Sequence, residues 1–125
     1  MAEPPQILSV EDNADTRLLL QHTLKDTYEV TFATGVEEAL AAMDDDPFDL
    51  LLLDINLGTR QGGVELLHEV RGQDGFGDIP AVALTAFAMP GDREDLLAEG
   101  FDAYVGKPFT HTELTTTIDR ALSDT

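Results

Sequence analysis

Short apolar runs alternate along the chain with segments whose apolar residues recur every three or four positions. The runs are expected to form five β-strands, at residues 6–10, 28–33, 48–54, 79–85 and 101–106. The third contains four consecutive leucines, Leu50 to Leu53, and ends in Asp54. A run this apolar is typical of a strand buried on both faces, so its terminal carboxylate must be paired, hydrated or used in chemistry.

The segments between and after the strands have helical periodicity and helix-ending signals. Asn13 can cap a first helix that runs to about Lys25, and Gly100 can end a fourth that begins near Met89 and Pro90. The remaining helices are expected around residues 36–43, 64–70 and 114–122.

Alternation of strands and helices predicts an α/β fold, namely a doubly wound, five-stranded parallel sheet with helices on both faces. In such sheets, ligands bind beyond the carboxyl ends of the strands, where the strand order reverses. The length of 125 residues and the hydrophobic content of 42% suit one core, so we expect a single domain over residues 1–125.

The strong negative charge of the chain disfavours two classes of binding partner. The chain has 25 acidic and 7 basic residues, with a formal net charge of −18, so neither direct nucleic-acid binding nor binding to a membrane surface is expected. The acidity fits an ordinary acidic domain or a surface adapted to a salt-rich cytoplasm. A cytoplasmic location is expected because the sequence lacks cysteine, a long apolar run and a leader-like beginning.

Polar residues follow the predicted strands at the ends where a ligand would bind. Glu11 and Asp12 follow the first strand, Asp54 ends the third, Thr85 ends the fourth, and Lys107 with Pro108 follows the fifth. Three neighbouring carboxylates require a cation, because like charges disfavour one another's ionised forms. Oxygen ligands favour Mg²⁺, with Mn²⁺ as the alternative, and the backbone carbonyl of Asn56 could add a further oxygen.

The same residues suggest a reaction. Lys107 can neutralise charge beside Asp54, and the Thr85 hydroxyl can donate a hydrogen bond to a phosphoryl oxygen. With a metal ion also present, the Asp54 carboxylate is suited to attack phosphorus and form an acyl phosphate.

Four motifs carry a family resemblance: ILSVEDN, LLLLDINL, ALTAFA and DAYVGKPF, at residues 7–13, 50–57, 83–88 and 102–109. In this order and spacing, the chain resembles the receiver domain of two-component response regulators over essentially its whole length. The resemblance implies a flavodoxin-like (βα)5 fold with strand order 2-1-3-4-5. One departure is the segment 55–63, which lacks proline and has one additional residue before the glycine preceding the third helix.

By this resemblance Asp54 is the phosphoacceptor and Mg²⁺ is held by Asp12, Asp54, the Asn56 carbonyl and, through water, Glu11. Thr85 and Lys107 contact the phosphoryl group, Thr85 and Tyr104 form a switch, and the Lys107–Pro108 bond is cis. The fourth helix, fifth strand and fifth helix form the face that changes.

The predicted function is a signalling switch phosphorylated by a histidine kinase or phosphotransfer protein, with self-catalysed dephosphorylation and no external substrate. The downstream target is not indicated, and a phosphorylation-linked homodimer is compatible with the resemblance. A free-standing receiver and a receiver from a hybrid kinase both remain open. A small aspartyl-phosphate phosphatase is the alternative, disfavoured because such enzymes usually carry aspartate where this chain has Asn56. A flavin module is disfavoured because residues 10–15, VEDNAD, would repel its phosphate.

Overall fold

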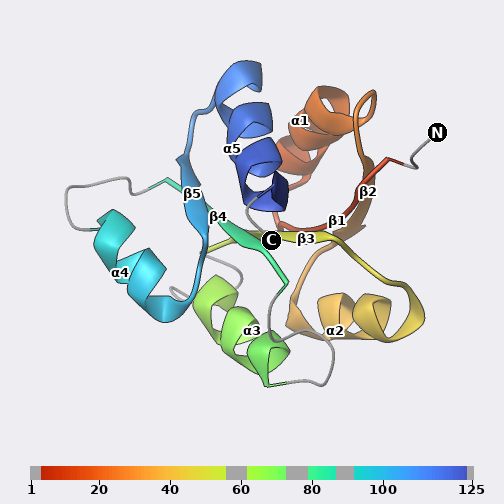
Figure 1. Cartoon of the computed structure of the whole chain (residues 1–125). Coiled ribbons are helices and arrows are strands. Elements are labelled where there is room, and N and C mark those ends of the chain that lie inside the picture. Colours follow the sequence, from red (N-terminus) through yellow and green to blue (C-terminus); the bar gives the residue numbers. More distant parts are fainter. Residues whose placement is uncertain (1–3, 56–61, 73–78, 87–91, 124–125) are drawn as a thin grey trace.

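A computed structural model describes residues 4–55, 62–72, 79–86 and 92–123, in which strands and helices alternate (Figure 1). The strands are β1 (Gln6–Val10), β2 (Glu29–Ala33), β3 (Leu50–Asp54), β4 (Ala81–Thr85) and β5 (Ala103–Gly106). The helices are α1 (Ala14–Leu24), α2 (Val36–Asp45), α3 (Gly62–Arg71), α4 (Asp92–Glu99) and α5 (His111–Ser123).

The five strands form one parallel sheet in the order β2-β1-β3-β4-β5. This order confirms the predicted doubly wound fold. The chain first moves outward from β1 to β2 and then returns past β1 to β3, so the strand order reverses between β1 and β3. The carboxyl ends of these two strands therefore flank the position where this class of sheet binds ligands.

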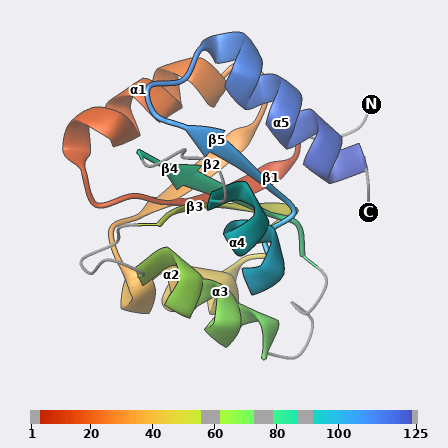
Figure 2. The same ribbon diagram turned by 90° about the vertical axis from the view of Figure 1, so that its left-hand side faces the viewer.

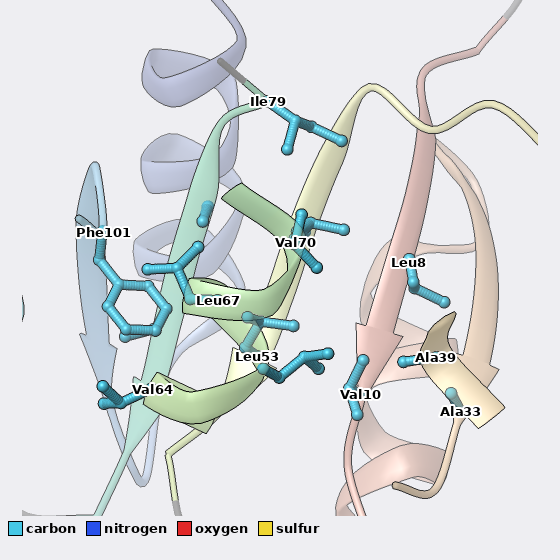
Figure 3. Packing of buried hydrophobic residues seen from close by; sticks show 14 of the residues in the cluster. Leu8, Val10, Ala33, Ala39, Leu53, Val64, Leu67, Val70, Ile79 and Phe101 are labelled. Carbon is cyan, nitrogen blue, oxygen red and sulfur yellow. The ribbon is translucent and has the colours of Figure 1, made fainter. Parts of the chain in front are cut away.

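Helices cover both faces of the sheet, with α1 and α5 on one face and α2, α3 and α4 on the other (Figure 2). Successive side chains of a strand point to opposite faces, so each face needs its own apolar residues. Leu50 and Leu52 belong to the core under α1 and α5, whereas Leu51 and Leu53 belong to the core on the other face. Figure 3 shows the second core, where Leu53 lies beneath α3.

All four leucines of β3 are at most 1% exposed, which confirms the prediction of a strand buried on both faces. Full burial of such a side chain stabilises the fold by about 1.5–3 kcal/mol relative to leaving it in water. The strand that carries Asp54 is therefore held by packing from two sides as well as by hydrogen bonds to both neighbouring strands.

Two predicted helix ends are confirmed. The Asn13 side chain accepts a hydrogen bond from the backbone N–H of Thr16 at 3.0 Å, which caps α1. After α4, Gly100 has a φ of 116°, a conformation that glycine adopts without the steric cost of a β-carbon. The predicted beginning of this helix near Met89 and Pro90 lies outside the described residues.

Four strands begin one or two residues later than predicted. Phe48, Ile79 and Phe101 are buried although they precede their strands. An apolar run indicates which residues are buried. Some of these residues pack against the core without joining the hydrogen-bonded ladder, so the run is longer than the strand. Within the described segments, none of the helices combines the length and apolar character needed to cross a membrane.

Candidate functional site

Three carboxylates meet at the carboxyl ends of β1 and β3. Val10 lies beside Leu53 in the parallel pairing of these strands, so the residues that follow them emerge side by side. One carboxylate oxygen from each of Glu11, Asp12 and Asp54 lies within 4.8 Å of the others. The three acidic residues expected to meet therefore do so, at the reversal of strand order.

Lys107 reaches the same cluster from the far side of β4. Its Nζ lies 3.0 Å from Oε1 of Glu11 and 3.5 Å from Oδ2 of Asp54. The backbone N–H of Lys107 donates to the Thr85 carbonyl at 2.7 Å, and the Lys107–Pro108 peptide bond is cis. The long side chain thus brings one positive charge between two buried carboxylates.

The cluster is largely buried and contains more negative than positive groups. Glu11 is 1% exposed and Asp54 4% exposed, whereas Asp12 is exposed. Desolvation, followed by interaction with Asp54, raises the pKa of Glu11 to about 7, although hydrogen bonds from Lys107 and the Asn13 backbone oppose the shift. One ammonium group does not balance three carboxylates, so the cluster has an excess of negative charge.

The cluster has the ligands of a hard divalent cation. All three side chains offer carboxylate oxygens that are close enough to share one ion. Magnesium is usually bound through one or two carboxylates with water completing its shell, and the exposed side of Asp12 leaves access to solvent. A bound cation would also offset the interaction with Asp54 that contributes, after desolvation, to the raised pKa of Glu11.

Thr85 is the last residue of β4 and is buried beside the end of β3, where Leu84 pairs with Asp54. Tyr104 is half-buried and packs against the core on the face of α2, α3 and α4. It pairs with Ala83, two residues before Thr85, so the two side chains leave the sheet on the same face. The predicted ligand Asn56 lies outside the described residues.

Two contacts at the site were not predicted from the sequence. Arg17 of α1 donates a hydrogen bond from Nη1 to the Glu11 carbonyl at 2.9 Å. Gly63 of α3 lies against the backbone of Asp54. Both depend on how a helix is seated on the sheet, although the paired glycines at 62 and 63 were a signal for a close backbone approach.

Sequence comparison accounts for this arrangement. The sequence model of the response regulator receiver domain matches residues 7–119. The chain belongs to this family. Its flavodoxin-like fold and strand order agree with the predicted ones.

Relatives of this receiver domain differ in overall length. It is 34% identical over 122 residues to the sensor histidine kinase TmoS of Ectopseudomonas mendocina, covering 98% of the chain but 12% of that kinase. It is 33% identical to the polar-differentiation response regulator DivK of Brucella anthropi, covering 97% of the chain and 98% of DivK. The chain thus spans a small part of one relative and nearly all of the other.

A solved structure resembles the receiver domain closely. The receiver domain of sensor histidine kinase PA1611 from Pseudomonas aeruginosa PAO1 superposes with a TM-score of 0.85 and 31% identity, over 97% of this chain and 99% of that one. That structure has a magnesium ion coordinated in its active-site cleft.

Proposed function

We propose that this receiver domain is a phosphoacceptor switch in which Asp54 takes a phosphoryl group from a histidine kinase or a phosphotransfer protein. The observation that carries the proposal is the gathering of Glu11, Asp12 and Asp54 with the ammonium of Lys107 at one sheet edge. The kinship with sensor kinases and a response regulator supports a kinase as the partner.

In the transfer, an oxygen of the Asp54 carboxylate forms a bond to phosphorus while the phosphorus–nitrogen bond of the donor's phosphohistidine breaks. The electron pair of that bond stays on the imidazole, which takes a proton from solvent. Later, a water oxygen forms a bond to phosphorus while the bond between phosphorus and the Asp54 oxygen breaks, which releases inorganic phosphate and restores the carboxylate. No external substrate takes part in this second step.

Each residue of the site has a role in this chemistry. The buried leucines of β3 hold the Asp54 carboxylate in place, which lowers the cost of orienting it in the transition state. The Lys107 ammonium, 3.5 Å from Asp54, neutralises charge on the phosphoryl oxygens, and the Thr85 hydroxyl donates to one of them.

The acidic cluster would hold Mg²⁺, or Mn²⁺ in its place, through Asp12, Asp54, the Asn56 carbonyl and, by way of water, Glu11. When bound, the ion supplies positive charge that offsets the charge of the incoming phosphoryl group. PA1611, whose receiver domain shares the fold, has its magnesium in the active-site cleft, which supports this assignment.

Phosphorylation would be read out on the face formed by α4, β5 and α5. A shift of Thr85 toward the phosphoryl group leaves space that Tyr104 can enter, because both side chains lie on the same face of the sheet. The phosphoryl group then shifts the population between two arrangements of this face, which binds a downstream protein or a second copy of the domain.

Intact-protein mass spectrometry after incubation with acetyl phosphate and Mg²⁺ tests the proposal. The parent should gain one adduct of about 80 Da, and Asp54→Asn should gain none. Asp26→Asn, which removes an exposed aspartate in the turn after α1, should behave like the parent. A parent without the adduct, or an adduct that persists in Asp54→Asn, would refute the assignment.

A further inference from the structure

Arg17 links the beginning of α1 to the end of β1. Its backbone N–H donates to the Asn13 carbonyl at 3.0 Å, as part of the first turn of the helix. Its half-buried guanidinium group reaches back along the chain and donates from Nη1 to the Glu11 carbonyl at 2.9 Å. The side chain therefore spans the segment that carries the two acidic residues of the site.

Glu11 is held from several directions. The Glu11 N–H donates to the Ala33 carbonyl of β2 at 2.9 Å, and the Glu11 carbonyl accepts from Arg17. The Glu11 side chain accepts from the Asn13 N–H at 3.2 Å and from Lys107 at 3.0 Å. Among the described residues, Arg17 is the side chain that donates to the carbonyl joining Glu11 to Asp12.

The hydrogen bond from Arg17 to the Glu11 carbonyl acts where neighbouring carboxylates repel one another. Repulsion among Glu11, Asp12 and Asp54 favours movement of the first two away from β3. Rotation of the Glu11–Asp12 peptide would allow such movement, because both carboxylates are attached next to it. A planar guanidinium group resists this rotation by a charge-assisted hydrogen bond to the carbonyl.

We infer that Arg17 is a positioning residue for the cation site. It fixes the Glu11–Asp12 peptide so that both carboxylates keep the orientation needed to bind a divalent cation. The inference rests on the proposed function for the identity of the cation, and Arg17 itself touches neither the cation nor the phosphoryl group in this role.

Charge and position predict opposite effects of removing Arg17. Replacement by glutamine changes the formal net charge from −18 to −19, and long-range attraction alone would then strengthen Mg²⁺ binding. Loss of the hydrogen bond would instead weaken it, because groups that orient metal ligands typically contribute about tenfold or more to metal affinity. The sign of the change therefore distinguishes the two explanations.

The experiment is a calorimetric Mg²⁺ titration of the parent, Arg17→Gln, Arg17→Lys and Arg120→Gln. Arg17→Gln should bind Mg²⁺ about tenfold more weakly, and Arg17→Lys, which retains the charge and can donate but lacks the planar guanidinium group, about threefold more weakly. Arg120→Gln is the matched control, because it removes an exposed arginine of α5 and should bind at least as tightly as the parent.

Parent-like or tighter binding by a folded Arg17→Gln would overturn the inference. If thermal denaturation shows that this variant is unfolded, parent-like binding by Arg17→Lys would overturn it instead.

Phosphorylation by acetyl phosphate supplies a second readout. The Mg²⁺ concentration for half-maximal phosphorylation of Arg17→Gln should rise by the same factor as its dissociation constant, while the rate at saturating Mg²⁺ stays within about twofold of the parent. A lower rate at saturation without a change in Mg²⁺ dependence would contradict the positioning role. If the parent is not phosphorylated on Asp54, the proposed function fails while the titration still tests Arg17.

Discussion

Gly63 packs directly against the backbone of Asp54. A β-carbon built on Gly63 would lie 2.3 Å from the Asp54 carbonyl oxygen, closer than such atoms can approach. The Gly63 N–H also donates to the Ile55 carbonyl at 3.1 Å. The beginning of α3 is thus seated on the strand end that presents the proposed phosphoacceptor, at a distance only glycine permits.

Gly63→Ala should both destabilise the protein and slow its phosphorylation. The methyl group must displace either the helix or the Asp54 backbone, and overpacking of this kind typically costs about 1–3 kcal/mol. Urea denaturation and the initial rate with acetyl phosphate measure the two effects. Gly35→Ala is the matched control, because a β-carbon there has no atom within 4 Å. Parent-like stability and rate in Gly63→Ala would show that the contact does not position Asp54.

Local patterns were sufficient to predict a parallel sheet and the side chains that gather at the carboxyl ends of its strands, whereas the strand order followed from the family resemblance. Parallel strands bring their carboxyl ends to one edge, so residues at strand ends, such as Asp54 and Lys107, could be expected to meet without knowledge of side-chain geometry. The burial of β3 followed from its four leucines for a similar reason. The burial of β3 follows from a local apolar run, and the meeting of the strand ends follows from the parallel direction of the strands.

Contacts that depend on how helices sit on the sheet were not predicted. Arg17 reaches the Glu11 carbonyl from a helix, α1, that packs on the sheet through Leu20 and Leu24. At the opposite edge of the sheet, Arg71 of α3 donates to the carbonyls of Ile79 and Gly100, which periodicity cannot anticipate either. An arginine can reach many partners, so its contact is decided by tertiary packing.

Glu11 should make the stability of the metal-free protein depend on pH. Its folded-state pKa of about 7 lies above the ordinary value of 4.5, so the folded protein binds the proton more tightly than the unfolded chain. This contribution is fully present below about pH 4.5 and is lost as the pH rises through about 7. The free energy of unfolding measured in EDTA should therefore fall over this interval and level off above it.

Glu11→Gln should remove most of this dependence, because glutamine stays neutral like the protonated carboxyl. At pH 8 without metal, we expect the variant to be more stable than the parent by about 1–2 kcal/mol. Added Mg²⁺ should stabilise it less than it stabilises the parent. Glu69→Gln, which changes an exposed residue of α3, should retain the parent's pH profile. An unchanged slope in Glu11→Gln would assign the pH dependence to another group.

Ser9 places an unpaired hydroxyl inside the core. The residue is 1% exposed and lies in β1 between Phe32 of β2 and Leu52 of β3. Its Oγ has no hydrogen-bond partner in the part of the chain that the structure describes. A buried, unpaired hydroxyl costs free energy that an alanine methyl group does not.

Ser9→Ala should therefore raise the free energy of unfolding by about 1 kcal/mol. Urea denaturation monitored by circular dichroism is the measurement. Ser123→Ala, at the exposed end of α5, should change stability by less than about 0.5 kcal/mol. A loss of stability in Ser9→Ala would show that the hydroxyl is satisfied, for example by a buried water.

Salt should stabilise this domain because its surface is strongly acidic. With 25 acidic and 7 basic residues, the folded protein concentrates like charges that the unfolded chain can separate. Raising KCl from about 0.1 to 1 M shortens the screening length from about 10 to 3 Å. We expect the midpoint of thermal unfolding to rise by about 5 °C or more. A midpoint that does not change would show that repulsion does not limit stability.

A double variant identifies where this repulsion acts. Asp44 and Asp45 are exposed in the last turn of α2, where the helix dipole also disfavours negative charge. Asp44→Asn with Asp45→Asn should raise the midpoint at low salt and reduce the gain from KCl. Asp15→Asn is the control, because that aspartate lies in the first turn of α1, where the dipole favours it. Screening is nearly complete at about 1 M KCl. If the unfolding midpoint of the parent continues to rise above this concentration, its surface is adapted to high salt. If the midpoint levels off below it, the protein is an ordinary acidic domain.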